Sequence, residues 1–329
     1  MKILYAGSPL ASAVVLKKLI DASASVEGLE IAGVLTNPPS AKGRRSDLIP
    51  TEVASVASAA GIPVFEFDHL MTEARKAVAP LGCDLLVSFD YGRIFGPKFL
   101  GMFPLGGINL HPSALPAYRG CTPVPAAILN GESRLGVSVQ KLALKTDEGD
   151  ILAQEFIDLD GSETTLSLMD GDAVLSSDGL SGSSAVSEMG SSLLIEVLKK
   201  ACAEGKLEGE AQKGEASYTP FLKKEDGIID WSRTATEIDR QIRAYTPWPL
   251  CSAEFNGGRV LILKARVSDE KTDLECGTVL PYRKAVGIEI ACGQGTVLVV
   301  SELQLQGKKA MDYKSFLNGA RNFIGTVLR

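Results

Sequence analysis

The 329-residue chain is poor in histidine and contains only His69 and His111. With so few imidazole ligands we expect no zinc site and no other bound metal. The six cysteines include no C-x-x-C pair, which favours a reducing compartment over a disulfide framework. No apolar run approaches the roughly 18 residues that span a bilayer, and the first residues already follow a strand pattern. These absences predict a cytoplasmic protein without a signal peptide or membrane anchor.

A strong positive charge is also missing, since the net charge is −6. Such a balance is not typical of a nucleic-acid-binding protein. The charge is unevenly distributed, however, because residues 217–329 carry sixteen Lys and Arg against thirteen Asp and Glu, a net of +3 that leaves −9 on the rest. This asymmetry fits local basic patches better than a uniformly positive surface.

The first half of the chain alternates between strand and helix patterns. Strand patterns cover 2–6, 29–35, 84–89, 107–110 and 136–142, with helical patterns at 11–21 and 51–60 between them. The alternation predicts an α/β fold, a Rossmann-like doubly wound parallel sheet, in a catalytic domain over residues 1–203. Residues 6–12 contain one glycine where a dinucleotide fingerprint has three, which argues against a nicotinamide-dependent dehydrogenase.

Two segments of low hydrophobicity follow. Residues 171–185 are rich in Gly, Ser and Asp and cannot bury enough apolar surface to offset their ordering entropy. We therefore expect an inserted, flexible surface loop there. Residues 204–217 are rich in Gly, Glu and Lys and predict a linker between two domains.

The carboxyl-terminal part, residues 218–329, predicts one helix followed by short strands. The helical pattern spans 234–245, and strand patterns follow at 252–255, 259–267, 277–280, 287–291 and 296–304. Residues 256–258 and 293–295 have the composition of hairpin turns. Five short strands at this spacing predict a small barrel, in which we expect Trp231, Tyr245 and Trp248 to be core residues.

Polar residues gather at the end of one predicted strand. Asn109 and His111 are two residues apart, so on a strand they share a face and Leu110 takes the other. Open α/β sheets bind ligands at this carboxyl end. Asn can hold a developing oxyanion, His can pass a proton at neutral pH, and a later Asp, Asp147, can orient the imidazole. A lone His at a strand end is more often structural, but the three residues together favour acyl transfer to an amine.

These residues and their neighbours resemble the signature of the formyltransferases that use 10-formyltetrahydrofolate. The matching pieces are Asn109-x-His111, Ser113-Ala114-Leu115-Pro116, Arg119-Gly120-x-x-Pro123 and Asp147-x-Gly149-Asp150. Further pieces resemble the branch of the family that acts on methionyl-tRNA, namely residues 2–9, 36–45, 90–94, 229–231, 247–249 and 307–311. The resemblance covers nearly the whole chain.

The resemblance implies that a monomer transfers the formyl group of 10-formyltetrahydrofolate to the α-amino group of initiator methionyl-tRNA, without a metal. Asn109 would donate to the oxyanion of a tetrahedral intermediate, His111 would assist there or shuttle the proton, and Asp147 would orient His111. The folate contacts expected are Tyr91, Gly92, Ile94, Ser113, Ala114, Leu115, Pro116, Thr146, Gly149 and Asp150. The tRNA contacts expected are Lys42, Arg44, Arg45, Lys223, Lys224, Lys308 and Lys309. The carboxyl-terminal barrel would be an OB-like tRNA-binding domain.

Three other functions share part of this pattern. A sugar-nucleotide N-formyltransferase would have the same trio, but the basic stretch Gly307-Lys308-Lys309 argues against it. Glycinamide ribonucleotide transformylase would lack a second domain of this size. A non-catalytic RNA-binding module would not need an intact trio of Asn109, His111 and Asp147.

Overall fold

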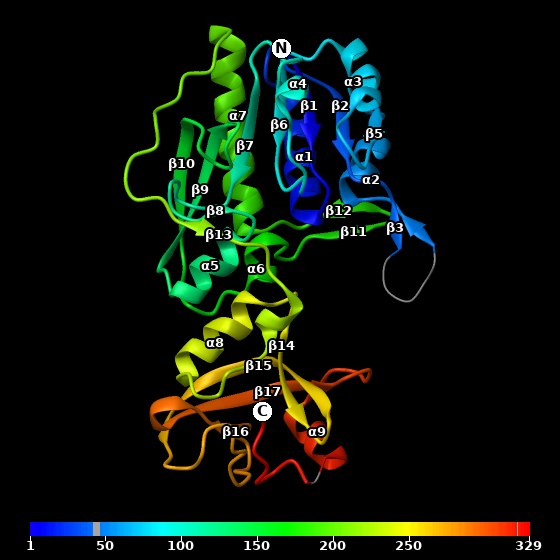
Figure 1. Ribbon diagram of the computed structural model, residues 1–329. Coiled ribbons are helices and arrows are strands. Elements are labelled where there is room, and N and C mark those ends of the chain that lie inside the picture. The colour runs from blue at the N-terminus through cyan, green and yellow to red at the C-terminus, as the bar shows by residue number, and fades with distance from the viewer. Residues whose placement is uncertain (42–46, 321) are drawn as a thin grey trace. The chain divides into compact units, whose positions relative to one another are not determined.

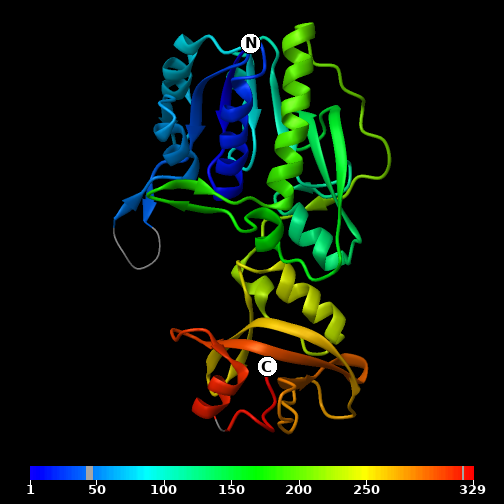
Figure 2. The same ribbon diagram turned by 180° about the vertical axis from the view of Figure 1, so that it is seen from behind.

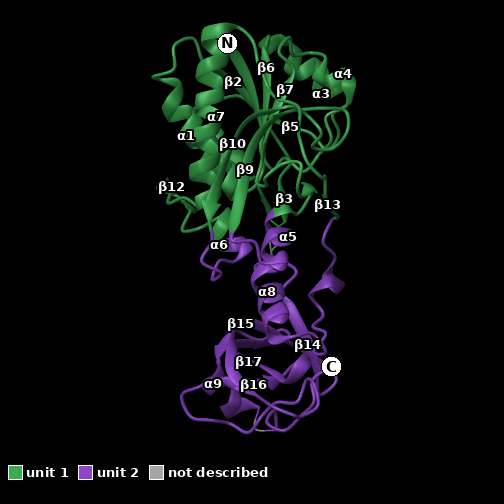
Figure 3. Ribbon diagram, turned by 90° about the vertical axis from the view of Figure 1, so that its left-hand side faces the viewer, with its two compact units in different colours: residues 1–123, 134–158, 167–220 green, residues 124–133, 159–166, 221–329 purple. Residues whose placement is uncertain are grey.

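The structure is a computed structural model that describes residues 1–41, 47–320 and 322–329. Its contacts group into two compact units (Figure 3). Unit 1 comprises Met1–Pro123, Arg134–Asp158 and Ser167–Pro220, and unit 2 comprises Val124–Ser133, Leu159–Leu166 and Phe221–Arg329. Each unit draws on three stretches of the chain, so no single point in the sequence divides them.

Unit 1 is built on a seven-stranded sheet with the order β10-β9-β7-β6-β1-β2-β5 (Figure 1). Five strands of this sheet pair with one another in parallel. They are β1 (Lys2–Ala6), β2 (Glu30–Thr36), β5 (Val64–Glu66), β6 (Leu85–Ser88) and β7 (Gly107–His111). Strands of this kind are almost wholly apolar because helices cover both faces of the sheet.

The other two strands are β9 (Arg134–Lys141) and β10 (Ile151–Asp158). Strand β9 pairs antiparallel with β7, and β10 pairs antiparallel with β9. The prediction of an all-parallel sheet is therefore wrong at this edge, and the sheet is mixed. A parallel neighbour needs a crossover helix on the sheet, whereas α5 (Pro123–Asn130), the helix before β9, is grouped almost entirely with unit 2. The antiparallel register sets Asn109 beside Gln140 and His111 beside Ser138.

Helices lie on both faces of the sheet. On one face α1 (Leu10–Ser23) packs beside α7 (Ala185–Glu204) and α2 (Glu52–Ala59) (Figure 2). Leu110 approaches α7 at Gly190, which turns Asn109 and His111 to the opposite face. That opposite face carries α3 (Thr72–Val78) and α4 (Pro97–Leu100), whose apolar residues share one buried cluster with Leu4 and Leu86.

The tract at residues 171–185 is a β-hairpin and not the irregular loop predicted. Strands β11 (Val174–Ser176) and β12 (Gly179–Ser181) pair across a two-residue turn. At the base, the Ser183 N–H donates to Asp172 Oδ1 over 2.8 Å and the Asp172 N–H donates to the Ser183 carbonyl over 3.1 Å. Backbone pairing of this kind needs little apolar burial, so the polar composition did not prevent it.

The amino termini of α7 and α1 are satisfied in different ways. Ser184 and Ser187 form a capping box at the start of α7. Helix α1 begins after Pro9, which supplies no side-chain cap, and Asp170 instead accepts a hydrogen bond from the Ala11 N–H. A carboxylate at a helix amino terminus is stabilised by the helix dipole, so the residue before the hairpin helps to fix the start of α1.

Unit 2 contains α8 (Ala235–Ala244) and a sheet with the order β14-β15-β17-β16. Its strands are β14 (Cys251–Phe255), β15 (Gly258–Lys271), β16 (Ile288–Ala291) and β17 (Thr296–Leu305), and β18 (Met311–Asp312) pairs with β17. The helix and four of the predicted strands are confirmed, as is the hairpin turn at 256–258. The predicted strand at 277–280 makes only isolated bridges at Thr278 and Val279. No pairing among the described residues closes this sheet into a barrel.

The aromatic residues of unit 2 divide between core and surface. Phe255, Phe316 and Phe323 pack edge to face, with α9 (Tyr313–Gly319) supplying Phe316. Trp231 and Tyr245 are buried as predicted, but Trp248 is 54% exposed, so its assignment to the core is wrong. Prolines on both sides of Trp248 remove two backbone donors and keep the segment out of the sheet.

The remaining elements are short. They are β3 (Ser40–Ala41), β4 (Leu48–Ile49), η1 (Ala79–Leu81), β8 (Arg119–Gly120), α6 (Thr165–Met169), β13 (Tyr218–Thr219), η2 (Lys224–Gly227) and η3 (Gly293–Gly295). In the part of the chain that the structure describes, no helix combines the length and the apolar character needed to cross a membrane.

Candidate active site

His111 is the last residue of β7 and is 5% exposed. Its Nε2 lies 2.9 Å from the Tyr118 carbonyl oxygen, and its Nδ1 lies 3.8 Å from Asp147 Oδ2. Because a carbonyl can only accept, Nε2 carries a proton, and this assigns the tautomer of the neutral ring. Both ring nitrogens thus face acceptor oxygens.

Asp147 is held on both of its carboxylate oxygens. Oδ2 accepts from the Gly120 N–H over 2.8 Å, and Oδ1 accepts from Gln140 Nε2 over 2.7 Å. Asp147 has φ 54°, in the left-handed region, so the loop turns sharply at this residue. Hydrogen bonds to a carboxylate are among the stronger ones in proteins, and the two together fix the side chain beside His111.

Asn109 differs from its neighbours because its carboxamide is not engaged. It is half-buried, and its side chain makes no hydrogen bond with any residue among those described. Since Asn109 and His111 share a face of β7, the amide stands beside the imidazole. The unengaged amide is therefore available to a bound ligand.

The loop after β6 contains three predicted folate contacts, Tyr91, Gly92 and Ile94. Tyr91 is 2% exposed, and its hydroxyl has no hydrogen-bond partner among the described residues. Burial raises the pKa of Tyr91 to about 12, so the hydroxyl remains a donor. Ile94 is 89% exposed, which is unusual for a large aliphatic side chain. Tyr91 belongs to the buried cluster on which Leu142, at the start of the Asp147 loop, also packs.

The predicted contacts in the turn after His111 are mostly buried. The Ser113 hydroxyl donates to the Ala117 carbonyl over 2.7 Å, and Leu115 is 3% exposed. Pro116 is buried and Ala114 is half-buried. The Ser113 hydroxyl is used inside the protein, so this turn supports the position of His111 and offers a ligand chiefly its backbone.

The predicted contacts in the Asp147 loop have three different environments. Thr146 is exposed. Gly149 lies so close to β9 that an added Cβ would stand 1.8 Å from the Lys141 carbonyl oxygen, so no other residue fits there. Asp150 pairs with Lys141 Nζ at 3.2 Å. The loop is therefore tied to β9 on one side and open at Thr146.

Four residues of this site were missed by sequence reasoning as functional candidates. They are Arg119, Gln140, Gln212 and Tyr218. Arg119 belongs to the motif Arg119-Gly120-x-x-Pro123, and Gln140 is a polar residue inside the predicted strand 136–142, so the sequence could have indicated both. Gln212 lies in the predicted linker, where composition gave none.

The surroundings of Cys121 disfavour nucleophilic catalysis by a cysteine. Burial, and then the charge of Asp147, raise the pKa of the Cys121 thiol. The thiol stays protonated at neutral pH and is not a thiolate nucleophile. Among the described residues, no group of three or more His, Cys, Asp or Glu side chains is arranged to hold a metal ion.

The predicted tRNA contacts in unit 2 are Lys223, Lys224, Lys308 and Lys309. All four side chains are exposed, and within the described ranges none of them forms an ion pair. The other three, Lys42, Arg44 and Arg45, lie outside the described residues.

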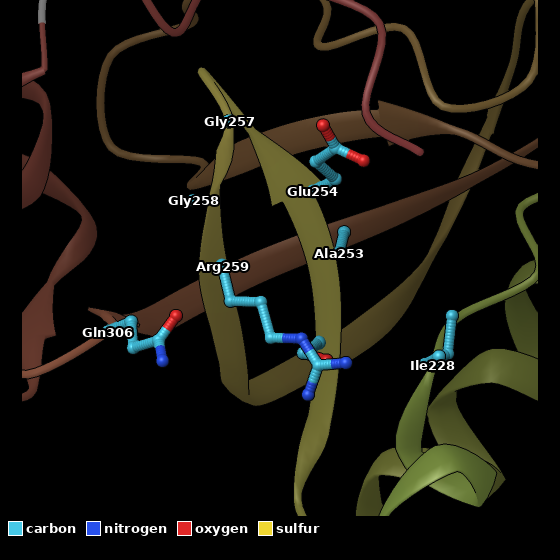
Figure 4. A pocket seen from close by; sticks show the side chains of 8 residues that line it. Ile228, Ala253, Glu254, Gly257, Gly258, Arg259 and Gln306 are labelled. Carbon is cyan, nitrogen blue, oxygen red and sulfur yellow. The ribbon is translucent and has the colours of Figure 1, made fainter.

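Unit 2 also has a hollow of about 390 Å³ beside the β14–β15 hairpin (Figure 4). Its lining includes Ser252, Arg259 and Gln306. The Arg259 guanidinium forms no ion pair within the described part of the chain. The Gln306 N–H donates to the Arg259 carbonyl over 2.9 Å, and Gln306 immediately precedes the stretch with Lys308 and Lys309.

Comparison with known proteins places these features in a family. The family model described as "Formyl transferase" matches residues 1–180, and the one described as "Formyl transferase, C-terminal domain" matches residues 222–321. The chain belongs to the formyl transferase family. It is 39% identical over 337 residues to the methionyl-tRNA formyltransferase of Treponema denticola, with 98% of each chain covered.

Solved structures share the fold of this chain. The chain resembles HypX from Aquifex aeolicus in complex with tetrahydrofolic acid, with a TM-score of 0.63, 16% identity, and coverage of 98% of this chain and 48% of that one. It also resembles the methionyl-tRNA formyltransferase from Clostridium thermocellum, with a TM-score of 0.53, 14% identity, and coverage of 89% of this chain and 100% of that one. At these identities the likeness concerns the fold.

Proposed function

We propose that this formyl transferase transfers the formyl group of 10-formyltetrahydrofolate to the α-amino group of initiator methionyl-tRNA, with Asn109, His111 and Asp147 as its catalytic residues. Full-length relatives that bear the name methionyl-tRNA formyltransferase support the amine substrate. The observation that carries the chemistry is the unengaged Asn109 carboxamide beside an imidazole whose two nitrogens face acceptors.

Asn109 supplies the oxyanion donor. When the amine adds to the formyl carbon, the formyl oxygen gains negative charge, and the Asn109 amide donates to it. An amide already held on a scaffold strand needs no reorganisation at that moment, which is why such donors stabilise transition states.

His111 moves the proton that the amine must lose. Nε2–H is occupied by the Tyr118 carbonyl, so Nδ1 is the nitrogen that takes the proton from the attacking amine and returns it to the departing nitrogen. Asp147 Oδ2, 3.8 Å from Nδ1, stabilises the imidazolium formed in between. Gly120 and Gln140 both donate to the carboxylate and hold it beside the ring.

The residues of the two loops fit a folate. The folate supplies the electrophilic formyl carbon and the nitrogen that leaves. Ile94 and Leu144, 89% and 78% exposed, are aliphatic surfaces suited to an aromatic ring system. The Tyr91 hydroxyl, which has no partner among the described residues, and the polar backbone of residues 113–116 and 146–150 offer hydrogen bonds at the same edge of the sheet. Apolar walls with a few polar groups are typical of cofactor pockets.

Unit 2 supplies the attraction for RNA in this proposal. Its Lys223, Lys224, Lys308 and Lys309, and also Arg259, form no ion pair with any described residue, so their charges can neutralise phosphates. We extend the proposal to an OB-like barrel for this unit, which the antiparallel order β14-β15-β17-β16 supports. The reaction takes place in the cytoplasm, in keeping with six unpaired cysteines.

The test is a substrate comparison. The purified chain is incubated with 10-formyltetrahydrofolate and, in parallel, with methionyl-tRNA or with an amino-sugar nucleotide, and the formylated amine is identified by mass spectrometry. Formyl-methionyl-tRNA is the expected product. Formylation of the sugar alone would replace the proposed substrate, and tRNA binding without any transfer would reduce the chain to an RNA-binding module.

A further inference from the structure

The segment predicted as a plain linker is hydrogen-bonded to both loops of the candidate site. The Glu210 N–H and carbonyl pair with Ile151, immediately after the Asp147 loop, over 2.9 and 2.8 Å. Further along, β13 pairs in parallel with β8, the strand that includes Gly120. Between these two attachments stands Gln212, whose side chain turns into the loop.

The Gln212 carboxamide is fully used, and its orientation follows from its partners. Nε2 donates to the carbonyl oxygens of Asp147 and Gly149, over 2.8 Å in each case. Oε1 accepts from Arg119 Nε and Nη2, over 3.1 and 2.8 Å. Carbonyls only accept and a guanidinium only donates, so the amide nitrogen and oxygen are assigned without ambiguity.

Arg119 is itself fixed, so it is a firm support for Gln212. Its guanidinium lies 3.3 Å from Glu148 and donates to the Tyr218 hydroxyl over 2.8 Å. Its carbon atom Cζ also lies 5.6 Å from the centre of the Tyr218 ring. The side chain of Arg119 is 11% exposed, so these contacts are largely shielded from water.

We propose that Gln212 is a positioning residue for formyl transfer, which fixes the Asp147 backbone and thereby the carboxylate beside His111. Asp147 has a left-handed φ of 54°, a conformation that a residue with a side chain keeps only when its surroundings hold it. The backbone carbonyls of Asp147 and Gly149 accept hydrogen bonds from the same amide nitrogen, so Gln212 closes the turn. The inference rests on the proposed function, because it assigns a role within that reaction.

The chemistry of the site requires an amide at position 212. Glutamate has the same size and would keep a charged partner for Arg119. It would, however, place an oxygen against the two carbonyl oxygens of the loop, because a carboxylate has no donor. Gln212→Glu therefore removes the hydrogen bonds to the loop while it keeps the contact with Arg119.

The experiment measures kcat and KM for both substrates in Gln212→Ala and Gln212→Glu, each in the full-length chain. Displacement of a catalytic group by about 1 Å costs on the order of 100-fold, so we expect kcat to fall by about 10- to 100-fold in both variants. KM for each substrate should stay within about threefold, since no binding group is removed. Lys213→Ala is the control, because Lys213 is an exposed neighbour that pairs with the exposed Glu210 and with no other described residue, and it should keep wild-type kcat.

A second measurement separates positioning from a general loss of structure. In an Asp147→Asn background, Gln212→Ala should cost less than about threefold further, because residues that act through one group are not additive. Full multiplication of the two losses, a wild-type kcat in the single variants, or an effect confined to KM would each overturn the inference. Thermal unfolding of Gln212→Glu near the wild-type midpoint establishes that the variant is folded. Failure of the wild-type chain to formylate methionyl-tRNA would instead overturn the proposed function.

Discussion

The loops around His111 and the basic segments of unit 2 are organised in opposite ways. Around His111, the side chains of Asp147, Gln140, Gln212 and Arg119 all have assigned partners, whereas the Asn109 carboxamide makes no hydrogen bond among the described residues. In unit 2, the four predicted lysine contacts are exposed and form no ion pair among the described residues.

The difference follows from what each region does in the proposed reaction. Stabilising a developing charge requires donors that are already in place. Attracting a polyanion requires only that cations be free and close to the surface, since that attraction acts at a distance and is screened by salt. Substitutions in the first region should therefore change kcat, and substitutions in the second should change binding and its salt dependence.

The largest effect is expected at His111. His111→Ala should lower kcat by about 10²–10⁴, the usual range for a lost acid–base group, while binding of the folate survives. Asn109→Ala should lower kcat by roughly 10²–10³ if it is an oxyanion donor. Single-turnover kinetics measure the rate of formyl transfer, and a separate titration measures the binding of the folate. An effect of Asn109→Ala on KM alone would assign it to binding instead.

A smaller effect is expected from reversing two charges in unit 2. Lys308→Glu combined with Lys309→Glu should weaken tRNA binding about tenfold at low salt, and the plot of log K against log salt should become less steep by about 1 to 2. The turnover at saturating tRNA should not change. Lys17→Glu with Lys18→Glu makes the same charge change on α1 of unit 1 and should leave the salt slope as in the wild type. An unaltered slope in the Lys308 and Lys309 variant would remove that stretch from the RNA surface.

Asp90 gives a pH-dependent prediction within unit 1. Burial, and then the charge of Asp170, raise the pKa of Asp90 to about 6 in the folded chain, above its ordinary value of 3.8. The folded state therefore binds more protons than the unfolded state between these two values, and stability falls as the pH rises through that window. Asp90→Asn should be more stable than the wild type above pH 6 and similar to it at pH 4.

The size of this effect is modest. The difference between these two pKa values corresponds to about 3 kcal/mol, but Asp90 is exposed to water, so we discount it to about 1 kcal/mol. Urea unfolding at several pH values measures it. Asp178→Asn in the exposed turn of the hairpin is the control for the removal of one carboxylate. A pH-independent difference for Asp90→Asn would contradict the prediction.

The smallest effect is expected from shortening the β11–β12 hairpin. Val174 and Ser181 are register partners, so Asn-Gly can replace residues 175–180 as a two-residue turn. The closure cost changes by about 0.6 kcal/mol per doubling of loop length, so the free energy of unfolding and kcat should both stay near wild type. Loss of turnover in a variant with a native circular dichroism spectrum would make the hairpin part of the substrate site.

Local features of the sequence were sufficient for several parts of this architecture. Period-two spacing placed Asn109 and His111 on one strand face, and the helical pattern at 234–245 predicted α8. These features depend on neighbours within a few residues.

The parts that were wrong or missed depend on distant partners. The direction of β9 is decided by its pairing with β7, and apolar patterning is the same for either direction. Gln212 acquires its partners 63 to 93 residues away, at Gly149, Asp147 and Arg119. Composition alone cannot indicate such contacts, because a polar segment that is held by hydrogen bonds has the same composition as a flexible one.

The register between β7 and β9 limits how the chain can change in length. Asn109 faces Gln140 across this strand pair, and Gln140 in turn donates to Asp147. Side chains alternate between the faces of a sheet, so inserting one residue within β9 ahead of Gln140 would turn that amide to the α7 face. Length variation is thus tolerable at the tip of the β11–β12 hairpin but not in the eight residues of β9. Comparing natural insertions and deletions along this family would locate the catalytic register without any measurement of activity.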